Sequence, residues 1–451
     1  MGGMREFLRG FSIVFLLGAG VVGGFLFFPS RPFFGLFDGA GSAVVSFGGG
    51  EDAPAGKTVE ERIAEAEAKS AKIKGIYMTA DVASDEGSGA TRLREHIIRI
   101  AEDTEINGIV IDVKEVCGVD YDEKRIRELL TELKRKNIWS IARITVFKDA
   151  SQIHAHPDWY LARTSPHAVG GECARKRHLT AKAGGTPAPV VGGALWQDRR
   201  GGYWMDPAVQ GVRRYMLDIS KRMIDLGFDE LQFDYIRFPS DGDMEQAIYP
   251  AWDRKTPRHE VLKSFFAFLQ DTLKAYKPEI ILSADIFGYV AAQREDLTIG
   301  QRLDDIGHFF DYVSFMVYPS HYYSGLYYPA DPIHDLPAVN YTLSQARMHP
   351  DVVVGRSLIA ARDYLDGKTG TTSIAGISAS TTPDMVLARG RRARLRPWLE
   401  DFYHEDDQAA GRPYGAEKVR LQIDAAEDAE DAGWLLWNAA NIYTEGALKK
   451  K

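Results

Sequence analysis

The chain has 451 residues, of which 45% are hydrophobic and 26% are charged, and this balance excludes a largely disordered protein. The formal net charge of -8 at pH 7 argues against nucleic acid as a partner, because DNA and RNA binding depends on lysine and arginine side chains that neutralise phosphates. The length allows two or three average domains or a single large α/β barrel.

An uncharged apolar run at residues 11–28 follows Arg5 and Arg9. Because the run is about 18 residues long, it can span a bilayer as a helix, and we expect residues 1–29 to form a signal anchor. The two arginines then stay in the cytoplasm and the rest of the chain is exported. A cleaved signal peptide is the alternative, since small residues follow at 41–43, but the run is longer than the apolar core of a usual signal peptide. The prediction is a single-pass protein of the cell membrane with its main domain on the extracytoplasmic side.

Residues 30–73 connect this segment to the first expected strand. Up to about residue 56 they are rich in Gly, Pro, Ser and Ala and lack periodicity, which indicates a flexible linker. Residues 58–73 are charged and helix-forming, so we expect either a short helical stalk or a cover on the N-terminal end of the next domain.

From residue 74 the chain alternates between apolar, β-branched segments and amphipathic helical segments. Helices are expected, for example, at 91–105 and 123–136, and Asp206 followed by Pro207 predicts the N-cap of another helix. Strands are expected at residues 74–80, 108–115, 138–147, 231–238, 280–288, 312–319 and 433–438. Such alternation indicates a parallel sheet with helices outside it.

An eighth strand lies either at residues 352–361 or at 393–402. In the first segment, apolar residues recur at spacings of four, three and four, which is typical of a helix, so we place strand seven at 393–402. Eight strands in strict alternation predict a closed (β/α)8 TIM barrel over residues 74–445, preceded by the transmembrane helix and the flexible linker.

Sequence motifs for cofactors are missing from the chain. No G-x-G-x-x-G follows the first strand and no P-loop motif occurs, so we expect no cofactor. His154 and His156 lack a third ligand at a known spacing, so we expect no metal either. Cys117 and Cys173 are permitted to form a disulfide in an exported protein, but two unrelated thiols are equally compatible with the sequence.

Acidic residues collect at the ends of the expected strands. Asp112 ends strand two, and Asp234, Asp285 and Asp401 end strands four, five and seven. The active site of a TIM barrel lies at this end, and strands four and five are neighbours. Asp234 and Asp285 can therefore supply the two carboxyl groups of glycoside hydrolysis, one protonating the leaving oxygen and the other attacking the sugar or activating water. The alternative for each is a strand-end aspartate that bonds a loop N–H or pairs with a base such as Arg237.

Aromatic residues gather at the same end, in the segments after strands three, six and eight. Sugar rings present C–H faces that pack on aromatic rings, so this set suits a saccharide groove, while packing inside the loops is the alternative. From this set and its polar neighbours we expect substrate binding by Asp112, Arg237, Trp204, Tyr318, His321, Tyr322, Trp437 and Asn438.

Several segments together resemble a family of bacterial putative glycoside hydrolases, TIM barrels related to α-amylase-type enzymes. The resemblance covers residues 74–443 and is carried by KGIYMTA, GIVIDVKE, HPDWY, WMDP, GFDELQFDYIRFPSDG, SADIFG, VSFMVYPSHY, RPWLEDF and GWLLWNAANIY. By analogy with α-amylase-like barrels, it implies that Asp234 is the nucleophile, Asp285 the acid/base and Asp401 an assisting group. The chain departs from that pattern by carrying Asp rather than Glu on strand five.

We therefore expect a membrane-anchored, exported glycoside hydrolase that cleaves a cell-surface or matrix polysaccharide with retention. The alternative from another class is a non-catalytic polysaccharide-binding or cell-wall scaffold protein on the same barrel. A lyase or transglycosylase that uses the same acids is a third possibility.

Overall fold

A computed structural model describes residues 57–164, 173, 194–292, 297–368, 392–402, 404–409, 411, 414–430 and 432–451. The expected anchor at 1–29 and the linker up to residue 56 lie outside these residues. Within the part that is described, none of the helices combines the length and the apolar character needed to cross a bilayer. Residues Lys57–Lys451 form one compact unit.

Eight parallel strands close into the predicted barrel, because β13 pairs with β1 and β7 pairs with β8. The strands in chain order are β1 (Ile73–Met78), β2 (Gly108–Lys114), β3 (Trp139–Thr145), β6 (Glu230–Asp234), β7 (Ile281–Phe287), β8 (Tyr312–Met316), a seventh strand in two pieces, β11 (Arg394–Leu395) and β12 (Trp398–Glu400), and β13 (Gly433–Trp437). The seventh strand is interrupted at Pro397, whose nitrogen cannot donate a ladder hydrogen bond.

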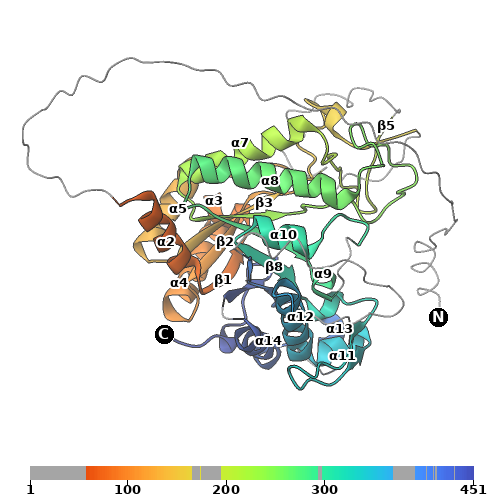
Figure 1. The fold of residues 1–451 in the computed structure, drawn as a ribbon. Coiled ribbons are helices and arrows are strands. Elements are labelled where there is room, and N and C mark those ends of the chain that lie inside the picture. The colour runs from red at the N-terminus through yellow and green to blue at the C-terminus, as the bar shows by residue number, and fades with distance from the viewer. Residues whose placement is uncertain are drawn as a thin grey trace, which may run out of the picture. The chain divides into compact units, whose positions relative to one another are not determined.

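Helices cover the outside of the barrel, with α7 beside α8 on one side and α12 beside α14 on another (Figure 1). The principal helices are α2 (Val59–Ser70), α4 (Ser88–Asp103), α5 (Glu123–Arg135), α7 (Gln210–Leu226), α8 (Arg258–Tyr276), α12 (Pro350–Leu365) and α14 (Ala416–Ala429). Shorter helices are α3 (Ala80–Ser84), α9 (Tyr289–Ala292), α10 (Leu303–Phe309), α11 (Leu343–Met348) and α13 (Glu405–Ala409). Two hairpin-like pairs lie outside the barrel, β4 (Ala162–Arg163) with β5 (Ala194–Leu195) and β9 (Leu326–Tyr328) with β10 (Val339–Tyr341).

The segment at 352–361 is helical, as its apolar spacing predicted, and belongs to α12. The predicted helix start at Asp206 is wrong, because α7 begins at Gln210 with Val209 as its N-cap. The carboxylate of Asp206 instead accepts hydrogen bonds from the backbone N–H groups of Ala208, Ala251 and Trp252. A buried aspartate that joins two loops has the same local sequence as an N-cap, so only the distant partners distinguish the two.

Polar side chains occupy part of the barrel interior. On β6, Leu231 and Phe233 pack in the layer between strands and helices, so Glu230, Gln232 and Asp234 face inward. The inward set places a carboxylate at each end of this strand and an amide between them. This alternation explains how an apolar strand comes to carry aspartate at its C-terminal end.

At the N-terminal end of the barrel, Glu230 and Arg396 form an ion pair with 0% side-chain exposure on both partners. Arg396 Nη1 lies 2.9 Å from each carboxylate oxygen, and Nη2 donates to the carbonyl of Ser70 at 2.9 Å. Ser70 is the last residue of α2, and its Oγ lies 3.1 Å from Tyr312 Oη. The helix before the barrel therefore covers its N-terminal end, which was one of the two expected arrangements.

Cys117 and Cys173 form a disulfide, with Cα atoms 5.5 Å apart, and the two residues are 56 positions apart in the sequence. A loop of this length predicts that reduction lowers the free energy of unfolding by about 4 kcal/mol, because the cross-link restricts the unfolded chain. Thiol titration in denaturant should find no free thiol before reduction and two per chain after it. A Cys117→Ser/Cys173→Ser double variant should unfold at the urea midpoint of the reduced protein. Two free thiols in the unreduced, oxidatively prepared protein would contradict the bond.

Candidate active site

The predicted acids of strands four and five lie at one level of the barrel. Phe233 of β6 pairs with Ala284 of β7, so the residues that follow, Asp234 and Asp285, end up side by side. Both strands leave the barrel at its C-terminal end, where TIM-barrel sites are built. Asp112 on β2 pairs in register with β3 at the same end.

One arginine on β3 contacts all three of these acids. Arg143 Nη1 lies 2.6 Å from Asp112 Oδ1, Nε lies 3.6 Å from Asp285 Oδ2, and Nη2 pairs with Asp234. We call these four residues the acid cluster. Although burial acts to lower the pKa of Arg143, the charges of Asp112 and Asp234 raise it well above its ordinary value, so the guanidinium stays charged.

The acid cluster is almost completely shielded from solvent. The side chain of Asp285 is 1% exposed, that of Asp234 is 7% exposed and that of Arg143 is 10% exposed. Asp234 therefore has the dedicated partner that a buried carboxylate requires. The expected base was Arg237, and the structure supplies Arg143 in its place.

Asp285 has the properties of a proton carrier. Burial raises its pKa well above the ordinary value, and the charge of Asp234 raises it further, while Arg143 acts in the opposite direction. Trp398 Nε1 donates to Oδ1 at 2.8 Å, but Oδ2 accepts no hydrogen bond from any described residue. A buried acid whose pKa is raised, next to a second carboxylate, is the arrangement that general acid catalysis uses.

Asp234 is fixed by an unusual turn. β6 stops at Asp234, earlier than the predicted end at 238, because Tyr235 adopts φ 51 in the left-handed region. A non-glycine residue pays on the order of 1–3 kcal/mol for this conformation, and such strain clusters at functional sites. The Tyr235 N–H donates to Asp234 Oδ1 at 2.5 Å, so the turn itself orients the carboxylate.

Aromatic rings form one wall of the acid cluster. The ring centroid of Trp437, at the end of β13, lies 4.9 Å from the guanidinium carbon of Arg143, 4.0 Å from the Tyr77 ring and 5.5 Å from the Trp398 ring. The hydroxyl of Tyr77 bonds to Asp112. Trp437 is partly exposed, so of the predicted aromatic residues it combines contact with the cluster and access to solvent.

Tyr318 and His321 continue the wall toward solvent. Tyr318 is buried, and after burial itself the charges of Asp285 and Asp234 contribute most to raising its pKa. His321 is exposed, and its ring centroid lies 5.4 Å from that of Tyr318. Of these two predicted residues, Tyr318 is thus buried within reach of the acids' charge, and His321 lies next to it at the surface.

Strand seven presents Glu400, and not Asp401, to the polar groups of the mouth. Asp401 Oδ2 accepts from the Thr444 N–H at 2.7 Å and Oδ1 from Thr444 Oγ1 at 2.6 Å, so this carboxylate secures the segment after β13. Glu400 Oε2 accepts from the Ser320 N–H at 3.1 Å and from Ser320 Oγ at 2.6 Å, and Oε1 lies 3.3 Å from His404 Nε2. Consecutive strand residues face opposite sides of a sheet. The residue of strand seven on the side of the other acids is therefore Glu400, one position before the predicted Asp401.

Two predicted binding residues are packed inside the loops. Arg237 is 8% exposed, and its guanidinium carbon lies 4.7 Å from the Trp204 ring and 4.6 Å from the Phe287 ring. Trp204 is 1% exposed and donates from Nε1 to Asp198 at 2.9 Å. The prediction that these two residues contact substrate is therefore corrected. Both instead pack within the loops at the C-terminal end of the barrel.

Tyr322 and Asn438 are also occupied elsewhere. Tyr322 is 2% exposed and its hydroxyl lies 3.3 Å from Ser357 Oγ, in a core beneath β9 and β10. Asn438 Nδ2 donates to the Asp401 carbonyl at 2.6 Å, while Oδ1 accepts from the Ala440 N–H at 2.8 Å. Asn438 therefore closes a turn, and both of its side-chain polar atoms are used in doing so.

The sequence did not single out several residues of this site, namely Tyr77, Arg143, Trp398 and Glu400. A two-residue alternation offered a signal for Arg143, since Trp139 and Ile141 on the same strand also face the interior. No comparable signal identified Trp398, because its role depends on a neighbour 113 positions away.

A family model described as "Putative glycosyl hydrolase domain" matches residues 75–443. No curated protein matches the chain.

Among solved structures, a hypothetical protein from Ruminiclostridium thermocellum ATCC 27405 is 26% identical, with 47% of this chain and 96% of that chain covered and a TM-score of 0.35. The α-galactosidase from Thermus thermophilus is 11% identical, with 82% of this chain and 58% of that one covered and a TM-score of 0.43. The glycoside hydrolase domain of PelA from Pseudomonas aeruginosa is 10% identical, with 82% and 96% covered and a TM-score of 0.36. This chain thus spans little more than half of the Thermus enzyme.

Proposed function

The chain belongs to the family described as "Putative glycosyl hydrolase domain", which confirms the predicted family, and from this premise we propose that it hydrolyses glycosidic bonds with Asp234 and Asp285. The observation that carries the proposal is the contrast between two neighbouring carboxyl groups that share Arg143. The pKa of Asp285 is raised well above its ordinary value, and its Oδ2 accepts no hydrogen bond from the described residues, whereas Asp234 pairs closely with Arg143 and also accepts the Tyr235 N–H. Pairs of acids with divergent environments divide into a proton donor and a nucleophile or base.

In the proposed reaction, Asp285 donates its proton to the glycosidic oxygen as the bond to the anomeric carbon breaks. Asp234 attacks that carbon and forms a covalent glycosyl ester. Asp285, now ionised, takes a proton from water, whose oxygen attacks the anomeric carbon and releases Asp234. Arg143 orients both carboxyl groups and keeps them close, which supports a retaining course, since retention requires carboxyl groups only about 5–5.5 Å apart.

The substrate that we propose is a cell-surface or matrix polysaccharide outside the cell. The apolar run at 11–28 supports a membrane anchor, and the Cys117–Cys173 disulfide supports an oxidising compartment. The partly exposed ring of Trp437 next to the acid cluster supports contact with a sugar face.

A non-catalytic polysaccharide-binding role is the second candidate. The observation in its favour is the low exposure of the acid cluster, with the Asp285 side chain only 1% exposed. On this alternative the acids and Arg143 neutralise one another as a structural unit, and sugar binds above them on the aromatic wall.

The test is release of reducing ends from a panel of surface and matrix polysaccharides. We expect turnover of at least one polymer, and we expect its rate to fall as pH rises. The sign follows from Asp285, because an acid whose pKa is raised is protonated below that pKa and loses its proton as pH passes through it. A polymer that binds without release of products at any pH would favour the binding role and remove the enzymatic one.

A further inference from the structure

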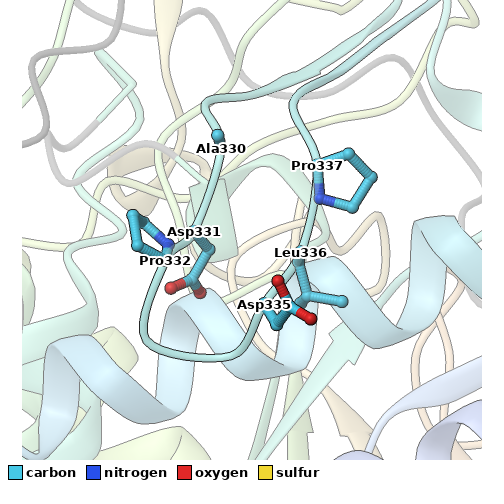
Figure 2. A pocket seen from close by; sticks show the side chains of 6 residues that line it. All are labelled: Ala330, Asp331, Pro332, Asp335, Leu336 and Pro337. Atoms are coloured by element: carbon cyan, nitrogen blue, oxygen red, sulfur yellow. The ribbon is translucent and has the colours of Figure 1, made fainter.

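A second group of charged side chains lies outside the barrel mouth, where a loop rests on α12. Residues 330–337 connect β9 to β10, and Figure 2 shows Asp331 and Asp335 on the two arms of this loop. Two backbone hydrogen bonds of 2.8 and 2.9 Å join Asp331 and Leu336 across the base. Arg356 of α12 also donates to the carbonyls of Pro329, at 2.6 Å, and of Pro337. The loop is therefore fastened to the helix at both of its ends.

This fastening brings together three potential metal ligands. His334 Nδ1 lies 2.8 Å from Asp331 Oδ2 and 3.5 Å from Asp363 Oδ2 of α12. One ligand atom of each residue lies within 4.8 Å of the other two. Atoms bound to one ion at about 2.0–2.2 Å lie roughly 3–3.5 Å apart in tetrahedral or octahedral geometry, so a single cation can reach all three with little movement.

Asp363 has only distant partners for a largely buried carboxylate. The residue is 7% exposed, and its carboxylate accepts no hydrogen bond from any described residue. Its nearest positive groups are His334 Nδ1 at 3.5 Å and Lys368 Nζ at 3.9 Å. Neither contact is a hydrogen bond, so a cation bound directly to this largely buried carboxylate would add stabilisation that His334 and Lys368 do not supply.

The surroundings set the conditions for such an ion. Asp331 and Asp335 line a hollow of about 330 Å³ beside the loop, and Asp331 is the one proposed ligand among the residues that line it (Figure 2). Lys368 competes for Asp363, but its side chain is 55% exposed and can withdraw into solvent. Arg356 is held by the carbonyls of the loop and approaches no carboxylate closely enough for an ion pair among the described residues.

We infer that Asp331, His334 and Asp363 form a binding site for a divalent transition-metal cation, with zinc as the best match. One imidazole and two carboxylates suit zinc and manganese, whereas calcium prefers oxygen ligands alone. The ion ties the loop at 330–337 to α12 and has no contact with the acid cluster. This inference departs from the expectation that the chain holds no metal, and it does not depend on the proposed glycosidase activity.

The test uses the full chain, purified in detergent and stripped with a chelator. Equilibrium dialysis against micromolar zinc, followed by elemental analysis, should find one tightly bound ion per chain. His334→Ala and Asp363→Asn should each weaken this binding by at least about 100-fold, since loss of even an outer-shell partner costs about 10- to 100-fold. Manganese should compete with the zinc, and calcium should not.

Asp335→Asn is the matched control, because it removes a carboxylate that lines the same hollow without belonging to the ligand set. Asparagine tolerates the left-handed conformation found there, φ 54, so the loop should keep its shape and its zinc. The far-ultraviolet circular dichroism of each stripped variant should match that of the wild type, which separates lost ligands from lost folding. Absence of stoichiometric zinc in the wild type, or equal zinc affinity in folded His334→Ala and wild-type protein, would overturn the inference. In that case His334 serves only as an ion-pair partner of the two aspartates.

Discussion

Replacing either carboxyl group of the proposed pair should abolish most turnover while leaving saccharide binding nearly intact. We expect Asp285→Asn to lower kcat on a natural polysaccharide by about 10²- to 10⁴-fold, the usual contribution of a general acid. Asp234→Asn should lower it by more than about 10⁴-fold, because no other group forms the bond to the sugar. Both substitutions preserve side-chain size, so the polymer should still bind.

The two variants should differ in their response to the leaving group. Aryl glycosides with acidic phenols leave without protonation, so Asp285→Asn should keep much of the wild-type rate on them. Asp234→Asn should be inactive on both kinds of substrate, since the nucleophile is needed in either case. This comparison separates the two roles, which a general loss of structure would affect equally.

Asp401→Asn is the matched control for this experiment. Its carboxylate accepts two hydrogen bonds from Thr444 and makes no hydrogen bond or ion pair with the described residues of the acid cluster, so we expect near-normal kcat with some loss of stability. Full activity of Asp285→Asn on the natural polymer would contradict its role as proton donor. A large loss of kcat in well-folded Asp401→Asn would instead restore the assisting role that the sequence had implied.

The largest expected effect on stability comes from the fully buried pair at the opposite end of the barrel. Arg396→Met should lower the free energy of unfolding by about 3–5 kcal/mol, because it leaves the Glu230 carboxylate buried without its counter-ion. Two donors would remain for Glu230, Trp139 Nε1 at 3.0 Å and Ser283 Oγ at 2.6 Å. These cannot replace a full positive charge. Urea denaturation followed by tryptophan fluorescence measures the change.

A double variant shows whether the loss of stability comes from the uncompensated charge of Glu230 or from the lost packing of the Arg396 side chain. Glu230→Gln with Arg396→Met removes the uncompensated charge and should recover part of the stability that Arg396→Met alone loses. Lys57→Ala, which removes an exposed partner of Glu65, should leave the denaturation midpoint nearly unchanged. If Arg396→Met unfolds at the wild-type midpoint, the pair does not hold the N-terminal end of the barrel and α2 together.

The sequence by itself determined the architecture and the neighbouring positions of the two candidate acids. Alternating strand and helix periods predicted the closed barrel, and the helical spacing at 354–365 decided which segment was strand seven. The sequence also predicted that Asp234 and Asp285 lie close together, because each stands near the C-terminal end of an apolar strand and parallel strands of a barrel end at a common rim, and the structure places them side by side. The family resemblance was likewise present in contiguous segments and is confirmed by the match over 75–443.

Only the tertiary structure decided which side chains meet. Strand phase decides whether Glu400 or Asp401 faces the other acids, and an error of one position reverses the answer. For this reason Asp401 was placed on the wrong side of the strand. Arg143 was overlooked because its partners come from three other strands, and Trp204 was taken for a binding residue because local sequence does not reveal how deeply a loop packs. Periodicity is a local property that each segment carries in its own residues. Contacts between distant segments depend on register, strand phase and loop packing, and these are fixed only when the barrel closes.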